Sequence, residues 1–425
     1  MPVDQGHLTG ARVYEQGIAV IGLGYIGLPT CAAIAAHRIG VVGVDVNPRT
    51  VDAINRGEAP IVEPDLDQAV EGAVASGFLR ASTEVPEADV FLLAVPTPFA
   101  DGHKPDLSFV EAATHSIAPR LRGGEVVILE STSPPGTTRR ISEWLSELRP
   151  DLTFPHQSDT PDVHLAHCPE RVLPGRIMIE IVANDRVVGG LTPSCAEAAA
   201  ELYRVFCKGE IVLTDATTAE MVKLTENAFR DVNIAFANEL ANVCGVLDLN
   251  VWEVISHANR HPRVNILSPG PGVGGHCIAV DPWFIVAAAP DQSKLIQTAR
   301  SINDDRPMAV VQNVIDATSG LAAPVVACLG LAFKADIDDL RESPARQVVK
   351  SLAQVEGLQV LAVEPHVEEL PDDLAALENV ELSSAESALE RADVVVLLVD
   401  HTSFRSIPAS ALGNRPVIDT RGLWR

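Results

Sequence analysis

The stretch IAVIGLGYIG at residues 18–27 decides the fold, because a short apolar run leads directly into a turn with three glycines. An apolar, alanine-rich segment, LPTCAAIAAH, follows at residues 28–37, and a second apolar run, VVGVD, ends at Asp45. A strand, a glycine turn, a helix and a second strand in this order are typical of a parallel α/β sheet. The first part of the chain is therefore predicted to be α/β.

The glycines of this turn follow the pattern GxGxxG, and each has a physical reason. Gly22 permits a tight turn, Gly24 lets backbone N–H groups approach a pyrophosphate, and Gly27 allows close packing of helix on strand. The helix N-terminus adds a positive dipole end for the phosphates. Asp45 lies at the spacing where a carboxylate accepts the ribose 2′-hydroxyl and repels a 2′-phosphate. The pattern indicates a Rossmann-type dinucleotide site that prefers NAD to NADP.

The rest of the chain repeats the α/β pattern after a helical interruption. Apolar runs expected to form strands lie at 90–95, 126–130 and 187–188, and then again at 325–333, 358–364, 394–400 and 416–420. We predict two Rossmann-like parallel-sheet domains joined by a central region with a long helix. The expected division is a tail at 1–17, an NAD-binding domain at 18–213, a central dimerisation region at 214–320 and a C-terminal domain at 321–425.

The central region opens with a long segment that contains no proline, AEMVKLTENAFRDVNIAFANELANVCGVL at 219–247. Thr217 and Glu220 have the spacing of a capping box at its start. Apolar residues such as Phe229 and Phe236 lie on several faces of the expected helix, more than one surface stripe needs. We therefore expect one long helix that forms a homodimer interface.

Composition excludes several classes of function. The chain has 57 acidic and 32 basic residues, a net charge of −25, so bulk attraction to nucleic acid or to an anionic membrane is not expected. Seven cysteines without CxxC pairs indicate neither a zinc ribbon nor a disulfide framework and fit a reducing cytoplasm. The twelve histidines show no metal-ligand spacing, and no apolar run is long enough to span a bilayer. We expect a cytoplasmic protein without a metal.

Two constellations outside the glycine turn have the residue types of catalysis. Cys277 ends the glycine-rich loop SPGPGVGGHC, where nearby backbone N–H groups favour a reactive thiol; the alternative is an inert packed cysteine. Lys223 and Asn227 are four residues apart and share a helix face, so both polar groups can reach one oxygen. The alternative for this pair is a solvated stripe. Adjacent His276 either assists the thiol or only packs in the loop.

Other candidates follow predicted strand ends, where open α/β sheets bind ligands. They are the turns VPTP at 95–98, STSPPGT at 131–137 and CPER at 168–171. Cations that suit phosphate cluster at Arg260, His261 and Arg263, and again at Lys334 and Arg341. Each of these cations has the alternative of pairing with one of the many carboxylates.

Taken together, these motifs resemble the UDP-glucose/GDP-mannose dehydrogenase family from about residue 18 to the C-terminus. The motifs are GLGYIG, VPTP, STSPPGT, CPERVLPG, KLTENAFRDVNIAFANEL, NRHPRVNILSPGPGVGGHC and GLAFKADIDDLRESP. The resemblance implies two successive NAD-dependent oxidations at C6 of a nucleotide sugar, through a thiohemiacetal and a thioester on Cys277. The wording RHPRVNIL and GPGVGGHCIAVDPWFIV is most similar to members that oxidise UDP-N-acetyl-D-mannosamine to its uronate for surface polysaccharides.

The resemblance also implies roles for individual residues. The implied catalytic residues are Cys277, Lys223, Asn227, Asp281, Glu170 and Thr132. The implied cofactor contacts are Gly22, Gly24, Tyr25, Ile26, Gly27, Asp45, Thr97, Thr132 and Arg341. The implied substrate contacts are Arg171, Val172, Lys223, Asn227, Arg230, His261, Arg263, Gly274, Phe333, Lys334 and Arg421. Arg263 is expected to reach a neighbouring subunit's site.

Several alternatives stay open from the sequence. Val280 stands where the UDP-glucose branch of the family has a lysine, which argues against UDP-glucose as substrate. No motif distinguishes the manno from the gluco configuration, so a UDP-N-acetylglucosamine 6-dehydrogenase is an alternative. A non-catalytic nucleotide-sugar-binding regulator and a simple two-electron dehydrogenase are the others, since a fold does not fix its chemistry.

Overall fold

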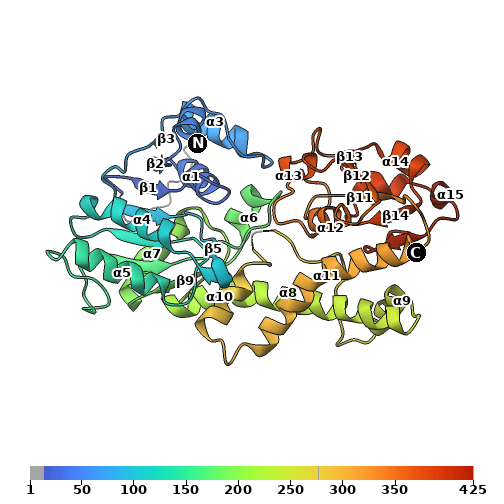
Figure 1. Ribbon diagram of the computed structural model, residues 1–425. Helices are drawn as coiled ribbons and strands as arrows, with labels where there is room; N and C mark the ends of the chain where they lie inside the picture. The colour runs from blue at the N-terminus through green and yellow to red at the C-terminus, as the bar shows by residue number, and fades with distance from the viewer. Residues whose placement is uncertain (1–13, 276, 425) are drawn as a thin grey trace, which may run out of the picture. The chain divides into compact units, whose positions relative to one another are not determined.

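The computed structural model describes residues 14–275 and 277–424. It divides the chain into an N-terminal unit, Met1–Thr225, and a C-terminal unit, Glu226–Arg425, which are described separately below (Figure 1). Most of the tail expected at 1–17 lies outside the described residues, and so does His276.

The N-terminal unit is built on an eight-stranded sheet in the order β10-β9-β8-β7-β4-β1-β2-β3. All neighbouring strands are parallel except β8 and β9, which are antiparallel. The strands are β1 (Ile18–Ile21), β2 (Val41–Val44), β3 (Leu79–Ser82), β4 (Val90–Leu93), β7 (Val126–Leu129), β8 (His164–His167), β9 (Arg186–Gly190) and β10 (Ile211–Asp215), with a small antiparallel pair of β5 (Phe99–Ala100) and β6 (Lys104–Pro105).

Helices follow most of these strands, as right-handed parallel crossovers require. They are α1 (Gly27–Ala35), α2 (Pro48–Asn55), α3 (Leu66–Ala75), α4 (Ser108–Ile117), α5 (Thr137–Leu148), α6 (Ile177–Ala183) and α7 (Pro193–Phe206), with 3₁₀ turns η1 (Asp101–His103) and η2 (Ala118–Arg120). The central strands of the sheet are apolar and buried on both faces, with every residue of β1, β4 and β7 buried. This is the burial expected of a parallel sheet covered by helices.

The C-terminal unit contains an all-parallel sheet in the order β13-β12-β11-β14-β15. Its strands are β11 (Val325–Leu329), β12 (Gln359–Val363), β13 (Val380–Leu382), β14 (Val394–Leu397) and β15 (Val417–Asp419). Its helices are α9 (Val251–Ala258), α10 (Asp281–Ala288), α11 (Lys294–Ala317), α12 (Pro344–Leu352), α13 (Asp372–Ala375), α14 (Ala385–Arg391) and α15 (Ala409–Leu412), with a 3₁₀ turn η3 (Thr402–Ser406).

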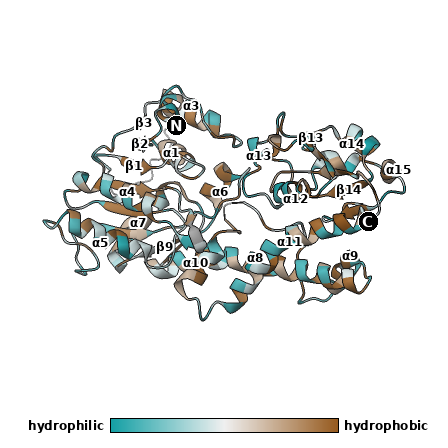
Figure 2. Cartoon of the chain, in the orientation of Figure 1, coloured by the Kyte–Doolittle hydropathy of each residue, from teal (hydrophilic) through white to brown (hydrophobic). Residues whose placement is uncertain are grey.

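The long helix α8 (Ala216–Val246) begins in the N-terminal unit and ends in the C-terminal unit. Hydrophobic and hydrophilic segments alternate along it (Figure 2). Phe229 and Phe236, on its expected apolar faces, are 68% and 52% exposed, whereas Leu224 is fully buried. No helix in the described part of the chain is long and apolar enough to cross a membrane.

The predicted fold class is confirmed, with two parallel-dominated sheets and a long central helix. The predicted capping box is wrong. Asp215 caps α8 instead, accepting hydrogen bonds from the Thr218 N–H at 2.9 Å and its hydroxyl at 2.5 Å. The Glu220 carboxylate is turned to the start of α5, where it accepts the Thr138 N–H at 2.7 Å.

Candidate active site

The carboxyl edge of the N-terminal sheet collects the predicted cofactor residues. Strands β8, β7, β4, β1 and β2 are consecutive neighbours and parallel, so their ends meet at one edge. The residues that follow these ends include every predicted cofactor residue of this unit: Gly22, Gly24, Tyr25, Ile26, Gly27, Asp45, Thr97 and Thr132. A ligand at this edge matches the general position of nucleotide sites in open α/β sheets.

The glycine turn forms a cradle that side chains would fill. Gly22 has a φ of +98°, and a Cβ there would lie 2.5 Å from the Ala94 carbonyl oxygen. A Cβ on Gly27 would lie 1.8 Å from the Gly22 oxygen. Gly24 is exposed with nothing within 4 Å of its Cβ position, so its backbone stays accessible to a ligand.

Two polar features beside the turn suit a dinucleotide. Helix α1 follows Ile26 as its N-cap, and no side chain caps the helix, so its first N–H groups are left for a phosphate. Asp45 accepts the Leu23 N–H at 3.1 Å and the Asn47 N–H at 2.9 Å while remaining half-buried, so its carboxylate can also accept a ribose hydroxyl. Tyr25 is 41% exposed beside them. These residues fit NAD.

The turns after β4 and β7 meet each other, as their neighbouring strands predict. The Thr97 hydroxyl donates to the Thr132 carbonyl oxygen at 2.5 Å. The Ser131 hydroxyl donates to the Val95 carbonyl oxygen at 2.7 Å, which ties the two turns together a second time.

Glu170, Arg171 and Val172 come from the turn after β8. Glu170 is buried and forms an ion pair with Arg186 at 2.9 Å. Arg171 is half-buried, with its guanidinium 3.3 Å from the Asp185 carbonyl oxygen, and Val172 packs against the hydrophobic core. Glu63 holds the far end of this turn, because its carboxylate accepts the N–H groups of Gly175 and Ile177 at 2.8 Å.

The start of α10 brings together the predicted catalytic residues of the C-terminal unit. Asp281 is the first residue of α10, and its N–H donates to the Cys277 carbonyl oxygen at 2.9 Å. The Asn227 amide, on α8, donates to the Asp281 carboxylate at 2.5 Å, and both side chains are buried. Cys277 is the exposed member among the seven cysteines, none of which forms a disulfide. Lys223 lies one helical turn before Asn227 on α8 and is half-buried.

The glycine-rich loop before Cys277 packs against the predicted substrate residues. A Cβ on Gly274 would lie 2.5 Å from the Glu342 carbonyl oxygen and 3.1 Å from the Phe333 Cβ. A Cβ on Gly270 would lie 2.9 Å from the Arg421 guanidinium. The loop is therefore held against the turn after β11 and against Arg421.

The remaining predicted cations are mostly exposed. Arg230, His261, Arg263 and Lys334 are exposed side chains, which leaves them accessible to a ligand. Arg341 forms a two-pronged pair with Asp339, at 2.9 and 2.7 Å. It belongs to the C-terminal unit, whereas the other predicted cofactor residues belong to the N-terminal unit, and its cofactor role stays a prediction.

Asp336, His366 and His401 are close enough together to hold a cation. Both ring nitrogens of His401 are already used, however. Its Nδ1 accepts the Asp336 N–H at 3.0 Å, and its Nε2 lies 3.0 Å from Glu364. Because a metal would have to break one of these hydrogen bonds, we assign no metal site here.

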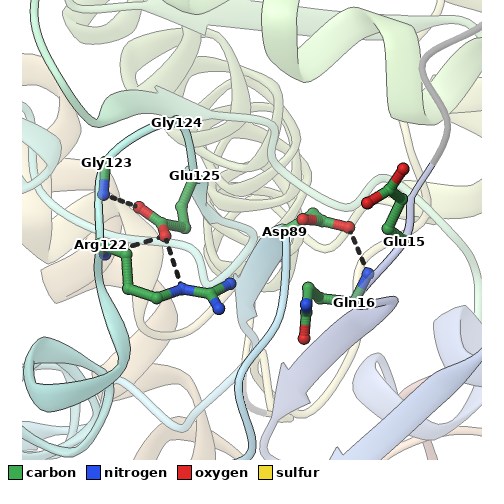
Figure 3. A pocket seen from close by; sticks show the side chains of 7 residues that line it. All are labelled: Glu15, Gln16, Asp89, Arg122, Gly123, Gly124 and Glu125. Atoms are coloured by element: carbon green, nitrogen blue, oxygen red, sulfur yellow. Dashed lines mark hydrogen bonds and ion pairs between the residues drawn. The ribbon is translucent and has the colours of Figure 1, made fainter.

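A hollow of about 400 Å³ lies at the opposite edge of the N-terminal sheet (Figure 3). Its lining residues precede β1, β4 and β7: Glu15, Gln16, Asp89, Arg122, Gly123, Gly124 and Glu125. Two of its acidic groups have protein partners: Asp89 accepts the Gln16 N–H at 2.8 Å, and Glu125 accepts the N–H groups of Arg122 and Gly123 at 2.9 Å. Because its lining residues precede the strands, the hollow lies away from the strand ends that carry the glycine turn. We do not assign it to catalysis.

Sequence reasoning missed a buried cluster behind Glu170. Its members are Glu130, which directly follows β7, Arg186 of β9 and Tyr203 of α7. The contacts join residues far apart in the sequence, and no short motif carries them. The sequence gives one weak signal for this cluster, which is a charged residue at the end of a predicted strand. Glu130 ends the apolar run at 126–130, and Arg186 directly precedes the run at 187–188.

The glycine cradle, the uncapped helix and the half-buried Asp45 carboxylate are the features of a dinucleotide-binding Rossmann fold. Comparison with known proteins identifies the family within this class of proteins. Three models of the UDP-glucose/GDP-mannose dehydrogenase family match in order: the NAD binding domain over residues 16–207, the central domain over 217–305 and the UDP binding domain over 327–425. The chain therefore belongs to this family and is an NAD-dependent UDP-sugar dehydrogenase.

Individual relatives cover almost the whole chain. It is 60% identical over 408 residues to the NDP-N-acetyl-D-galactosaminuronic acid dehydrogenase of Ralstonia nicotianae, with 96% of each chain covered. It is 56% identical over 417 residues to the UDP-N-acetyl-D-mannosamine dehydrogenase of Escherichia coli K12, covering 96% of this chain and 99% of that protein. The solved UDP-D-ManNAc dehydrogenase of Pyrococcus horikoshii matches with a TM-score of 0.86 at 39% identity, covering 96% of both chains.

Proposed function

We propose that this enzyme oxidises C6 of UDP-N-acetyl-D-mannosamine from alcohol to carboxylate, giving UDP-N-acetyl-D-mannosaminuronate. The observation that carries the four-electron chemistry is the exposed Cys277, whose carbonyl oxygen accepts the N–H of Asp281, the buried partner of Asn227. In the proposed site the Cys277 thiol supplies the nucleophile, the Asn227 amide an oxyanion donor and the Asp281 carboxylate a proton acceptor.

The first oxidation removes a proton and a hydride from the C6 alcohol. Bound NAD accepts the hydride in each of the two oxidations. Lys223 exchanges the hydroxyl proton, and the Asn227 amide donates a hydrogen bond to the C6 oxygen. Asn227 is fixed for this task because its amide is already oriented by the Asp281 carboxylate.

The second oxidation needs the thiol. Cys277 adds to the C6 aldehyde to form a thiohemiacetal, which again carries a transferable hydride, and its oxidation leaves a thioester. Hydrolysis then forms a C6–O bond from water and breaks the C6–S bond, which releases the carboxylate and the thiol. Glu170 takes the proton of the water, and Asp281 and Thr132 help to manage protons and water.

We propose the remaining contacts from the family resemblance. The proposed cofactor contacts are Gly22, Gly24, Tyr25, Ile26, Gly27, Asp45, Thr97, Thr132 and Arg341. The proposed substrate contacts are Arg171, Val172, Lys223, Asn227, Arg230, His261, Arg263, Gly274, Phe333, Lys334 and Arg421. In this proposal residues 18–213 bind NAD, 214–320 form the central dimerisation region and 321–425 bind the UDP moiety.

The Ralstonia relative gives specific support to a second substrate, a nucleotide of N-acetyl-D-galactosamine. The experiment is the NADH yield at completion with UDP-N-acetylmannosamine, beside the galactosamine, glucosamine and glucose nucleotides. We expect two NADH per sugar with the mannosamine compound and little with the others. One NADH per sugar would contradict the thioester mechanism, and two from another sugar would contradict only the substrate.

We also propose a homodimer in the cytoplasm, formed through α8. The support is the exposure of Phe229, Phe236 and Val243 along that helix, at 68%, 52% and 47%. Light scattering at micromolar concentration should give twice the chain mass of 45.2 kDa. Replacing Phe229 by Asp should shift this mass toward the monomer, and an unchanged mass would place the interface elsewhere.

A further inference from the structure

The buried cluster behind Glu170 contains charged groups that the proposed mechanism does not use. Arg186, the first residue of β9, is only 4% exposed. One of its terminal nitrogens lies 2.9 Å from a Glu170 carboxylate oxygen and also donates to the Ile181 carbonyl oxygen at 3.0 Å. Burying an arginine costs free energy unless its charge is paired, so a buried arginine at this position calls for a structural or functional reason.

The guanidinium is fixed in direction by what lies on its faces. Its central carbon lies 4.9 Å from the centre of the Tyr203 ring and 5.5 Å from that of Phe206. Stacking on aromatic rings and the Ile181 hydrogen bond leave this planar group little freedom to rotate. The position of the paired Glu170 oxygen is therefore set by the packing of α7 and β9.

The second oxygen of Glu170 is held separately, because it accepts the Arg171 N–H at 2.7 Å. Glu170 thus has one oxygen held from the interior by Arg186 and the other held by the backbone of its own turn. A carboxylate fixed at both oxygens keeps one orientation, which a base acting on a single water requires.

Among the residues that the structure describes, Glu170 is the carboxylate that forms an ion pair with Arg186. Glu130 is the other carboxylate in the cluster, and the Tyr203 hydroxyl donates to it at 2.7 Å. Burial raises the pKa of Glu130 to about 7, and burial raises the pKa of the nearby Cys168 thiol to about 12. Burial also raises the pKa of the Tyr203 hydroxyl, so the thiol and the phenol stay neutral.

We propose that Arg186 is a positioning residue for the hydrolytic step, because it holds the Glu170 carboxylate in the orientation that accepts a proton from water. The inference rests on the proposed role of Glu170. In the step concerned, water forms the C6–O bond, the C6–S bond to Cys277 breaks, and Glu170 takes the proton. Arg186 itself touches neither water nor sugar.

The test separates the oxidations from hydrolysis in the full-length enzyme with UDP-N-acetylmannosamine and NAD. Arg186→Met keeps an unbranched stem beside Tyr203 and removes the charge. We expect a burst of two NADH per active site at the wild-type rate and then turnover slowed about 100-fold, the size expected when a reacting group is misplaced. Intact-protein mass spectrometry should show the sugar nucleotide attached to Cys277 as a thioester.

Three further variants and one control show whether Arg186 acts through Glu170. Glu170→Gln should accumulate the same acyl-enzyme, and the double variant should be no slower than Glu170→Gln alone. Arg186→Lys keeps a cation without the planar fork and should recover part of the hydrolysis rate; it also serves if Arg186→Met fails to fold. Arg204→Met, which removes an exposed arginine of α7 paired with Glu197, is the matched control and should turn over normally.

The outcomes distinguish this inference from the proposed function. If Glu170→Gln accumulates the thioester while Arg186→Met hydrolyses it at the wild-type rate, the inference is overturned and the role of Glu170 stands. A double variant whose losses multiply would equally overturn it. If Glu170→Gln itself turns over normally, the proposed role of Glu170 fails whatever Arg186 does. A slowed burst of NADH in both Arg186→Met and Arg186→Lys would overturn the inference and give Arg186 a general structural role.

Discussion

The first two strands of each sheet end in the same kinds of residue, but these residues have different partners in the two sheets. In the N-terminal unit β1 ends before Gly22, with a φ of +98°, and its neighbour β2 ends before Asp45. In the C-terminal unit β11 ends before Gly330, with a φ of +93°, and its neighbour β12 ends before Glu364. Each sheet thus places a left-handed glycine and an acidic residue at adjacent strand ends.

The difference lies in what these groups bind. Asp45 is half-buried, and the start of α1 has no side-chain cap, so both are left for a ligand. Glu364 is only 5% exposed and accepts the N–H groups of Leu331 and Ala332 at 2.7 and 3.0 Å, with His401 3.0 Å away. The second sheet therefore binds, inside the protein, the same kinds of group that the first sheet leaves partly exposed at the proposed NAD site.

The largest expected effect breaks the first turn. Gly27→Ala puts a Cβ 1.8 Å from the Gly22 oxygen, a backbone atom that cannot move without opening the turn. Overpacking of this kind costs about 3 kcal/mol. We expect NAD binding, followed by fluorescence titration, to be lost and the thermal unfolding midpoint to fall by about 5–10 °C.

The matching glycine of the second sheet is the control for this variant. Gly330→Ala puts a Cβ 2.4 Å from the Val399 Cβ and should also lower the unfolding midpoint. Its NAD affinity should stay at the wild-type value. Equal losses of NAD affinity in both variants would contradict the assignment of the cofactor to the first sheet.

A smaller effect is expected on cofactor preference. Asp45→Ser removes the carboxylate that we propose accepts the ribose hydroxyl and repels a 2′-phosphate. Losing a charged hydrogen bond costs about 2 kcal/mol, so the ratio of kcat/KM for NAD over NADP should fall at least about 30-fold. Steady-state kinetics with both cofactors measure this ratio. Glu364→Gln should leave it unchanged, and a shift there would mean that the two carboxylates are not as different as their burial indicates.

The sequence predicts the strands that are buried on both faces and misses those that are not apolar. Strands β1, β4 and β7 are continuous apolar runs, and their sequences alone predict strands. Strand β8 has the sequence HLAH, which carries no apolar strand pattern. It is a strand because it pairs with β7 and β9, and a local pattern does not reveal this pairing. Strand β10 is an edge strand with exposed residues and also gives a weak signal.

The site divides in the same way between local and distant contacts. The glycine cradle and Asp45 are predictable because one short segment fixes their spacing. The Asn227–Asp281 hydrogen bond and the Arg186–Glu170 ion pair join separate elements, and only the folded chain brings their partners together. The capping-box prediction failed for the same reason, because the start of α5 competes for the Glu220 carboxylate.

The two sheets should also respond oppositely to pH, first through Glu364. Burial opposes its ionisation, but hydrogen bonds from His401 and from the Leu331 N–H keep the pKa of Glu364 below its usual value. Its stabilising contribution is therefore present at neutral pH and is lost as the pH falls below about 4.3 and through the lowered pKa. Glu364→Gln should lower the unfolding midpoint at pH 7 and match wild type at the lowest pH. A constant difference across this range would contradict the sign.

Glu130 should give the opposite response in the first sheet. Burial raises its pKa to about 7, so the folded state holds a proton that the unfolded chain loses above about 4.3. Wild-type stability should therefore fall as the pH rises from about 5 to 7, and Glu130→Gln should flatten this slope by about 1 kcal/mol or more. Thermal unfolding of both proteins at intervals from pH 5 to 8 measures it. Parallel curves for the two proteins would show that Glu130 does not titrate in this range.

The smallest expected effect concerns the helix caps of the two sheets. Ser343 caps α12 by accepting the Arg346 N–H at 3.5 Å, at the limit of a hydrogen bond, whereas Asn47 caps α2 by accepting the Arg49 N–H at 3.0 Å. Ser343→Ala should cost about 0.5 kcal/mol and Asn47→Ala about 1 kcal/mol. Amide hydrogen exchange in the first turn of each helix resolves such small local changes better than a global unfolding midpoint. A larger loss of protection in α12 than in α2 would contradict this order. It would mean that the Ser343 cap is stronger than its hydrogen-bond distance indicates.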